Sequence, residues 1–389
     1  MIKRTLFSAD HESFRDSFRR FLDKEVAPFH ADWEDQGYVD REVWRKAGAN
    51  GFLCMGMPEE YGGSGADKLY TVVQLEELAR GGYSGVGFSL HSEIVAPYIL
   101  RYGTAAQKQK YLPALARGEL IGAIAMTEPS AGSDLQGIKA TAVLEGDHYR
   151  LNGSKTFITN GWHADLVIVV AKTRPDLGAK GTSLLLVERG MPGFEKGKRQ
   201  KKVGMKAQDT SELFFNDVKV PVDNLLGGPA MENKGFICLM EQLPWERLQI
   251  ALGATAKSQA AIDWTVAYVK ERKVFGQPVG NYQTTRYVLA GLQAQVQGAR
   301  VFVDKCLELL LADSLDTDTA SMAKLMTTEL QCKVMDECVQ LYGGYGYMIF
   351  GSALWRPDVH RPPNPIPRLI TSFMISLVPP YRRETRASA

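Results

Sequence analysis

The N-terminal third of the chain shows a helical pattern of apolar residues. One set of apolar positions recurs about every three to four residues and so falls on one helix face: Phe14, Phe18, Phe21, Leu22 and Val26. A second set has the same spacing: Leu69, Val72, Val73, Leu75 and Leu78. We therefore expect a helical N-terminal domain over residues 1–121.

The pattern changes in the middle of the chain. Short runs rich in β-branched and aromatic residues occur at 166–171, 182–188 and 212–218, separated by Gly, Pro and Asp. Such runs, bounded by turn residues, are typical of β-strands. The sequence predicts a middle β domain over residues 122–233.

Long helical patterns return after this β-rich segment. They cover residues 248–272, 284–311 and 317–341 and are rich in Ala, Leu, Gln and Glu. Helices of this length with apolar faces usually pack as a bundle, and they leave surface for other subunits. We expect a C-terminal helical domain over residues 234–347, a multidomain α+β fold for the whole chain, and a homo-oligomer.

Composition excludes several classes of protein. The 389 residues carry 46 basic and 44 acidic side chains, so there is no electrostatic case for binding nucleic acid or a membrane surface. The five cysteines show no CxxC spacing, and the six histidines give no metal signature. With no apolar run near the roughly 18 residues that cross a bilayer and no signal-like N-terminus, we expect a cytoplasmic protein without a membrane-spanning segment.

Two stretches suggest a flavin pocket. Residues 126–134 read MTEPSAGSD, and residues 157–161 read FITNG. Both combine small residues with hydroxyl groups, which allow close backbone approach and offer hydrogen-bond donors to the edge of a planar ring. Each stretch alone also fits an ordinary turn. Their combination favours the flavin interpretation.

Three further segments have both a functional and a purely structural interpretation. Residues 272–278 (RKVFGQP) could meet a pyrophosphate, or could simply end a helix. Residues 340–347 (QLYGGYGY) form a glycine-rich loop that could approach a phosphate or ribose. Residues 241–248 (EQLPWERL) begin a helix with Pro244 near its first turn, where Glu246 could complement the helix N-terminus.

Together these stretches resemble the acyl-CoA dehydrogenase family across residues 14–347. The specific ones are MTEPSAGSD, FITNG, KAQDT, ELFFNDVKVP, ERL, RKVFG and QLYGGYGY, and the similarity is closest to the long-chain type through SLHSEIV, GAIAMTEP, GMKAQDTSELFF and EQLPWERL. The resemblance implies an N-terminal helical domain, a middle β-barrel and a C-terminal four-helix bundle, assembled as a homotetramer, a dimer of dimers.

The resemblance also implies an activity. Family members use FAD to desaturate the α,β bond of long- or medium-chain fatty acyl-CoA thioesters to trans-2-enoyl-CoA in fatty acid β-oxidation. A carboxylate removes the α-proton, a hydride leaves from the β-carbon to the flavin, and an electron-transferring flavoprotein reoxidises it. Branched-chain or isoprenoid acyl-CoA dehydrogenation, or a catalytically impaired flavoprotein, stay open as alternatives.

Residue roles follow from the matched motifs. The flavin ring would be held by Met126, Thr127, Gly132, Ser133, Phe157 and Thr159, with Ser133 also touching the CoA moiety. The dinucleotide part of FAD in a neighbouring subunit would meet Arg272, Phe275, Gln283, Gln340, Gly343 and Gly344. No metal ligand is implied.

The resemblance implies Glu246 as the catalytic base. Family members carry the base either in a C-terminal loop or at the Glu of the ERL stretch, and only the second is available here. A carboxylate in an apolar pocket has a raised pKa, which suits it to a weakly acidic C–H. Pro244 and Arg247 would lie at the substrate, and Glu241 is the second choice for the base.

The last segment, residues 348–389, departs from the family pattern. Family members continue with a helix and a YGGTNEI-type loop that contacts FAD and the thioester carbonyl. This chain instead places seven of its 18 prolines between Trp355 and Pro380, which no long helix tolerates. Loss of that loop would weaken flavin binding or catalysis.

A coding event could explain this Pro-rich tail. With suitable synonymous codons for residues 370–381, the opposite DNA strand in a shifted frame can encode YGGTNEIMKEVI, and the codons through residue 389 permit ADARVS upstream of it. We therefore hypothesise that the 3′ end of the gene is inverted. An opposite strand that lacks these codons in the nucleotide sequence would refute the hypothesis.

Overall fold

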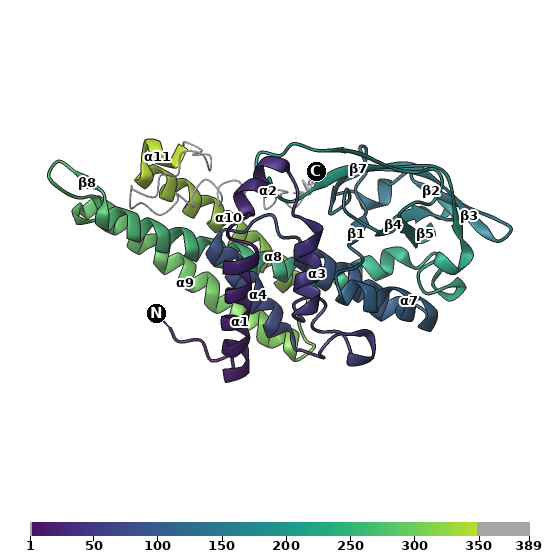
Figure 1. Ribbon diagram of the computed structural model, residues 1–389, viewed down its shortest axis with the longest axis horizontal. Coiled ribbons are helices and arrows are strands. Elements are labelled where there is room, and N and C mark those ends of the chain that lie inside the picture. Colours follow the sequence, from purple (N-terminus) through teal and green to yellow (C-terminus); the bar gives the residue numbers. More distant parts are fainter. Residues whose placement is uncertain (1, 348–389) are drawn as a thin grey trace, which may run out of the picture.

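The computed structural model describes residues 2–347, in which helices, a sheet and long helices follow one another (Figure 1). The Pro-rich tail predicted for residues 348–389 lies outside these described residues. The first region comprises α1 (Ala9–Glu25), α2 (His30–Gln36), α3 (Arg41–Ala49), α4 (Lys68–Gly81), α5 (Phe88–Leu90), α6 (Ala96–Tyr102) and α7 (Ala105–Ala116), with a π-helical turn at His91–Val95.

The apolar stripes predicted from the sequence form the core of this first region. Helix α1 begins at a capping box, in which Ser8 and His11 satisfy each other's backbone N–H groups. Its Phe18, Phe21 and Leu22 are buried in the largest hydrophobic cluster. The predicted helical faces of this region are confirmed.

A seven-stranded sheet forms the middle region. Its strands are β1 (Gly122–Ala125), β2 (Thr141–Glu145), β3 (His148–Thr159), β4 (Leu166–Lys172), β5 (Thr182–Glu188), β6 (Phe194–Arg199) and β7 (Thr210–Pro221). They pair in the order β1-β4-β2-β3-β7-β6, and β5 pairs with β4. Strand β4 is buried on both faces: Leu166, Ile168 and Val170 pack with the N-terminal helices, whereas Val167 and Val169 pack within the sheet's own core.

Three long helices build the C-terminal region: α8 (Gly235–Glu271), α9 (Gln283–Leu311) and α10 (Thr317–Tyr342), followed by the short α11 (Gly344–Tyr347). A small hairpin of β8 (Lys273–Val274) and β9 (Gln277–Pro278) connects α8 to α9 and lies at the far end of the molecule from the sheet (Figure 1). Among residues 2–347, no helix is both long and apolar enough to cross a membrane.

Two local predictions in this region are wrong. Helix α8 begins at Gly235, so Pro244 lies inside the helix rather than in its first turn. A proline inside a helix removes one backbone hydrogen bond, and the buried residues on both sides of it keep the helix continuous. Residues 344–347 form a helical turn, α11, rather than a loop.

Candidate active site

The loop that carries the first predicted flavin residues is fixed by a buried ion pair. Lys155 of β3 donates from Nζ to Oε1 of Glu128 at 2.8 Å and to the carbonyl oxygen of Met126 at 3.0 Å. The Glu128 carboxylate also accepts the backbone N–H groups of Lys139, at 2.6 Å, and Ala140, at 3.0 Å. Through its two bonds, Lys155, two residues before the FITNG stretch, connects β3 to the MTEPSAGSD stretch.

Both charges of this pair are taken out of water. The side chain of Lys155 is fully buried and that of Glu128 is 4% exposed. Burial lowers the pKa of Lys155, against the opposing effect of Glu128. Burial alone would raise the pKa of Glu128, but Lys155 and the two backbone donors hold it below its ordinary value. The pair therefore stays charged and positions the loop.

The second motif forms a platform at the end of β3. The ladder between β3 and β7 shifts register between Lys155 and Ile158. At this irregularity Phe157 has a positive φ of 59°, and its side chain is 68% exposed. The half-buried Thr127 and Thr159 have no side-chain hydrogen-bond partner within residues 2–347. An open aromatic ring beside open hydroxyls fits a planar cofactor such as a flavin.

The turn after β3 is held by a buried carboxylate. Asp209 accepts the backbone N–H groups of Trp162, at 2.9 Å, and His163, at 3.3 Å. Its own carbonyl oxygen accepts the N–H of Asn160 at 3.1 Å. Sequence reasoning did not assign a role to Glu128, Lys155 or Asp209. The sequence did offer a signal: each is a charged residue in or next to a motif, Glu128 in MTEPSAGSD, Lys155 two residues before FITNG and Asp209 in KAQDT.

Gly132 and Ser133 lie on the exposed part of the loop between β1 and β2, and Met126 is half-buried at its start. A Cβ added at Gly132 would meet no atom within 4 Å. The links between the two stretches run from Lys155 to Met126 and Glu128 and from the N–H of Thr156 to the carbonyl oxygen of Thr127, and Gly132 and Ser133 follow further along the same loop.

Glu246 lies on α8 in a different kind of environment. Its Oε1 accepts a hydrogen bond of 3.2 Å from the hydroxyl of Tyr98 on α6. Burial raises the pKa of Glu246 to about 7, although Tyr98 and Arg247 oppose the rise. The adjacent Trp245 is 7% exposed and packs in a hydrophobic cluster. A carboxylate that can exchange a proton near neutral pH is what a general base requires.

The neighbours of Glu246 differ in their exposure and contacts. Arg247 donates to the hydroxyl of Ser321 on α10 at 3.0 Å, and Pro244 is half-buried. Glu241 is exposed, accepts a 2.7 Å bond from Tyr102 and pairs with Arg101 at 3.2 Å. Because Glu241 is solvated and paired, it is the weaker candidate for a base.

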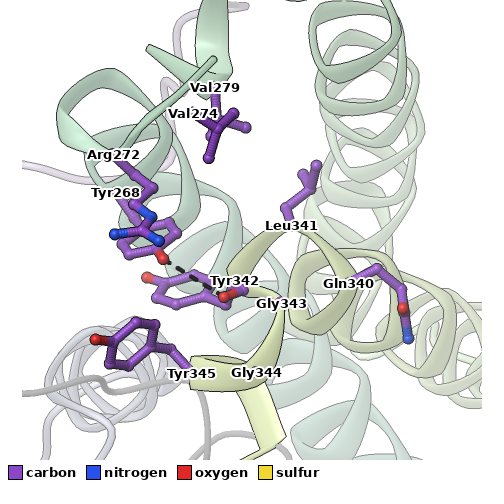
Figure 2. Close-up of a pocket in the computed structure, with 10 residues that line it drawn as sticks. All are labelled: Tyr268, Arg272, Val274, Val279, Gln340, Leu341, Tyr342, Gly343, Gly344 and Tyr345. Carbon is purple, nitrogen blue, oxygen red and sulfur yellow. Dashed lines mark hydrogen bonds between the residues drawn. The ribbon is translucent and has the colours of Figure 1, made fainter. Parts of the chain in front are cut away.

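The residues predicted for the dinucleotide part of FAD lie at the far end of α8. A pocket of about 430 Å³ there is lined by residues that include Arg272, Gln340, Gly343 and Gly344 (Figure 2). Tyr268 and Tyr342 stack with ring centroids 4.1 Å apart, and the guanidinium of Arg272 lies 5.9 Å from the ring of Tyr345. Gln340 points away from Arg272 in Figure 2.

Two residues of this group do not line that pocket. Phe275, at the tip of the β8–β9 hairpin, is 97% exposed with a φ of 47°. Gln283 is exposed at the start of α9 and donates to the hydroxyl of Tyr287 at 2.7 Å. The whole group lies at the opposite end of α8 from the sheet that carries Phe157 (Figure 1). One chain therefore presents the two predicted halves of a cofactor site at separate places.

Comparison with known proteins identifies the family. The N-terminal, middle and C-terminal domain profiles of acyl-CoA dehydrogenase match residues 8–119, 123–218 and 233–361. The mitochondrial long-chain specific acyl-CoA dehydrogenase of Mus musculus is 52% identical over 347 residues, which cover 89% of this chain and 80% of the relative. The chain belongs to the acyl-CoA dehydrogenase family.

Other relatives and a solved structure agree with this assignment. The isovaleryl-CoA dehydrogenase of Pongo abelii is 38% identical over 348 residues, with 88% of this chain and 81% of the relative covered. The crystal structure of an acyl-CoA dehydrogenase from Geobacillus kaustophilus superposes with a TM-score of 0.90 at 46% identity, covering 97% of this chain and 95% of that one. The predicted fold class is confirmed, and the chain is an acyl-CoA dehydrogenase of the flavoprotein oxidoreductase type.

Proposed function

We propose that this acyl-CoA dehydrogenase uses FAD to convert long-chain fatty acyl-CoA thioesters to trans-2-enoyl-CoA, with Glu246 as the base. The long-chain assignment is supported by the 52% identity to a long-chain specific relative. The observation that carries the proposal is a half-buried carboxyl group with a pKa of about 7, held by one neutral donor.

Glu246 would remove the α-proton of the thioester. An ionised carboxylate with a pKa near 7 binds this proton more strongly than one with an ordinary pKa, which favours transfer from carbon. Because Tyr98 engages Oε1, the other oxygen, Oε2, would receive the proton. Trp245, which precedes Glu246 on α8, is buried in a hydrophobic cluster.

The flavin-ring residues would hold FAD beside the reacting carbons. The two open hydroxyls, Thr127 and Thr159, would donate to its polar edge, and Phe157 would contact its ring. When bound, FAD accepts the hydride that leaves the β-carbon. The Lys155–Glu128 pair would keep the Met126 carbonyl and the adjoining loop in place.

The separation of the two groups of cofactor residues supports a homotetramer. Since the far end of α8 lies away from the sheet of the same chain, Arg272, Phe275 and Gln283 would meet the dinucleotide part of FAD bound to a neighbouring subunit. We also propose that an electron-transferring flavoprotein reoxidises the enzyme, as the resemblance implies. A solved neighbour with 35% identity carries that name in its description.

Anaerobic titration with a series of acyl-CoA thioesters tests the proposal. We expect bleaching of the oxidised flavin by palmitoyl-CoA, and a drop in the bleaching rate of about 10²–10⁴-fold in Glu246→Gln. Glu241→Gln is the matched control and should retain the native rate. Undiminished bleaching in Glu246→Gln would exclude Glu246 as the base.

The same titration distinguishes the alternatives. Fastest bleaching by isovaleryl-CoA or another branched thioester would replace the long-chain assignment with a branched-chain or isoprenoid one. A protein that retains flavin but is bleached by none of the thioesters would be the catalytically impaired flavoprotein.

A further inference from the structure

Tyr98 is the residue whose side chain contacts the carboxylate of the proposed base. It is fully buried, and its hydroxyl donates to Glu246 at 3.2 Å. The two residues are 148 positions apart in the chain and lie on different helices, α6 and α8. The contact therefore depends on how the N-terminal helices pack against α8.

The backbone before Tyr98 is unusual. A π-helical turn at His91–Val95 runs directly into α6, where Pro97 occupies the first turn. Such a turn inserts an extra residue into the helical spiral and so rotates every later side chain about the axis; π-helical turns of this kind are frequent at functional sites. Ile99, next to Tyr98, is also fully buried, so the aromatic side chain is firmly placed.

We infer that Tyr98 is a positioning residue that holds the Glu246 carboxylate through its Oε1 and keeps it ionised for proton abstraction. This inference rests on the proposed function of Glu246. A neutral hydroxyl that donates to a carboxylate stabilises the charged form without cancelling the charge. Burial raises the pKa of the Tyr98 phenol far above its ordinary value, so Tyr98 stays protonated and remains a donor at every working pH.

Few other ionisable groups act on Glu246. On its own helix, Arg247 lowers the pKa of Glu246 from a distance while donating to Ser321. On α4, Lys68 lies 4.9 Å from the ring centroid of Trp245 and pairs with Glu93 of the π-helical turn at 2.7 Å. Arg247 and Lys68 thus bond to Ser321 and Glu93 rather than to Glu246.

The remaining ionisable groups near this site lie around Tyr98 and Arg247. Tyr102 and Cys238 lie near Tyr98, and Lys324 of α10 lies near Arg247. Within residues 2–347, Tyr98 is the one hydrogen-bond donor to the Glu246 side chain. Its removal should therefore change the protonation of Glu246 directly.

The pH profile of kcat/KM tests the inference. In the native enzyme the rate should rise with pH through a midpoint near the Glu246 pKa of about 7. Tyr98→Phe removes the donor and should move this midpoint upward by about one pH unit. The value of kcat/KM should then fall about tenfold at pH 6 and change little above about pH 9. Tyr102→Phe, which removes a hydroxyl one turn away that is bonded to Glu241, should leave the midpoint unchanged.

A second measurement does not depend on turnover. A 3-thia-acyl-CoA has an acidic α-proton, and its deprotonation on the enzyme produces a long-wavelength absorption band. In that complex the α-proton passes to Glu246, so the band reports how the proton is shared between the thioester and the carboxylate. Tyr98→Phe, which makes Glu246 more basic, should strengthen the band at a fixed pH. If Tyr98→Phe fails to fold, 3-fluorotyrosine at position 98 preserves the shape and strengthens the donor. It should shift the midpoint of the rate downward and weaken the band.

The outcomes separate this inference from the proposed function. The positioning role would be overturned if Tyr98→Phe left the pH midpoint of kcat/KM unchanged, or if it lowered kcat/KM by the same factor at every pH. An active Glu246→Gln enzyme would instead overturn the assignment of the base. Loss of activity in Glu246→Gln together with an unshifted midpoint in Tyr98→Phe would leave the base in place and remove Tyr98 from the mechanism.

Discussion

Two carboxylates of this enzyme differ in their burial and in their partners: Glu128 is buried, and Glu246 is half-buried. Glu128 faces a buried ammonium and two backbone N–H groups, whereas Glu246 accepts a single bond from a neutral phenol. The pKa of the first is lowered, and that of the second is raised to about 7. A fully paired carboxylate fixes structure, and a sparsely paired one is left able to exchange a proton.

The cost of burial explains why these two roles are separated. Transfer of a carboxylate from water to a protein interior costs several kcal/mol, which is offset only by an opposite charge and further hydrogen bonds. The loop at Glu128 has this compensation, so the ion pair can hold the loop that carries Met126 and Thr127. At Glu246 the compensation is incomplete, and the uncompensated part appears as a raised pKa.

The largest expected effect comes from removing the charge of Glu128. Glu128→Gln keeps the shape of the side chain but leaves the Lys155 ammonium buried without an anion. We expect the free energy of unfolding to fall by about 3–5 kcal/mol and the retention of flavin to fall with it. Urea unfolding and the ratio of flavin to protein absorbance measure the two quantities.

Two variants control this prediction. The double variant Glu128→Gln/Lys155→Met removes both charges and should recover much of the lost stability, because no unpaired charge remains. Glu145→Gln breaks an exposed pair with Arg150 and should change stability by less than about 1 kcal/mol. A Glu128→Gln variant no less stable than Glu145→Gln would show that the buried pair does not hold the loop.

The comparison also shows how far the sequence could predict the site. The loop and the platform lie in short motifs, so local patterns and the family resemblance are enough to propose their residues for the flavin ring. The contact of Tyr98 with Glu246 could not be predicted from the sequence, because it depends on the packing of α6 against α8 and on a π-helical turn that has no sequence signal. The start of α8 was misplaced because Lys234 and Gly235 offer no side-chain cap, whereas Pro244 resembles a first-turn residue.

A smaller effect should be seen in how the stability depends on pH. The pKa of Glu246 is about 7 in the folded protein and near its ordinary value of 4.5 when unfolded, so the folded state binds this proton more tightly. The stabilisation is complete below about pH 4.5 and is lost as the pH rises to about 7. Its size is of order 3 kcal/mol, and Glu246→Gln abolishes this dependence.

Paired unfolding curves of the native enzyme and Glu246→Gln measure this contribution. Because other groups titrate equally in both proteins, the difference between the two free energies of unfolding isolates Glu246. The difference should move in favour of Glu246→Gln as the pH increases from 5 to 7 and then become constant. A difference that does not change with pH would mean that the pKa of Glu246 is near its ordinary value.

The smallest effect is expected at Glu241, which shares the helix with Glu246. Its carboxylate is exposed and already has a hydroxyl and a guanidinium as partners, so loss of its charge leaves no buried group unpaired. Glu241→Gln should change the free energy of unfolding by less than about 1 kcal/mol and leave the pH midpoint of kcat/KM in place. If it instead shifted that midpoint as Tyr98→Phe is expected to do, the charge of Glu241 would act on Glu246 across more than one helical turn. Burial alone would then no longer explain the difference between Glu241 and Glu246.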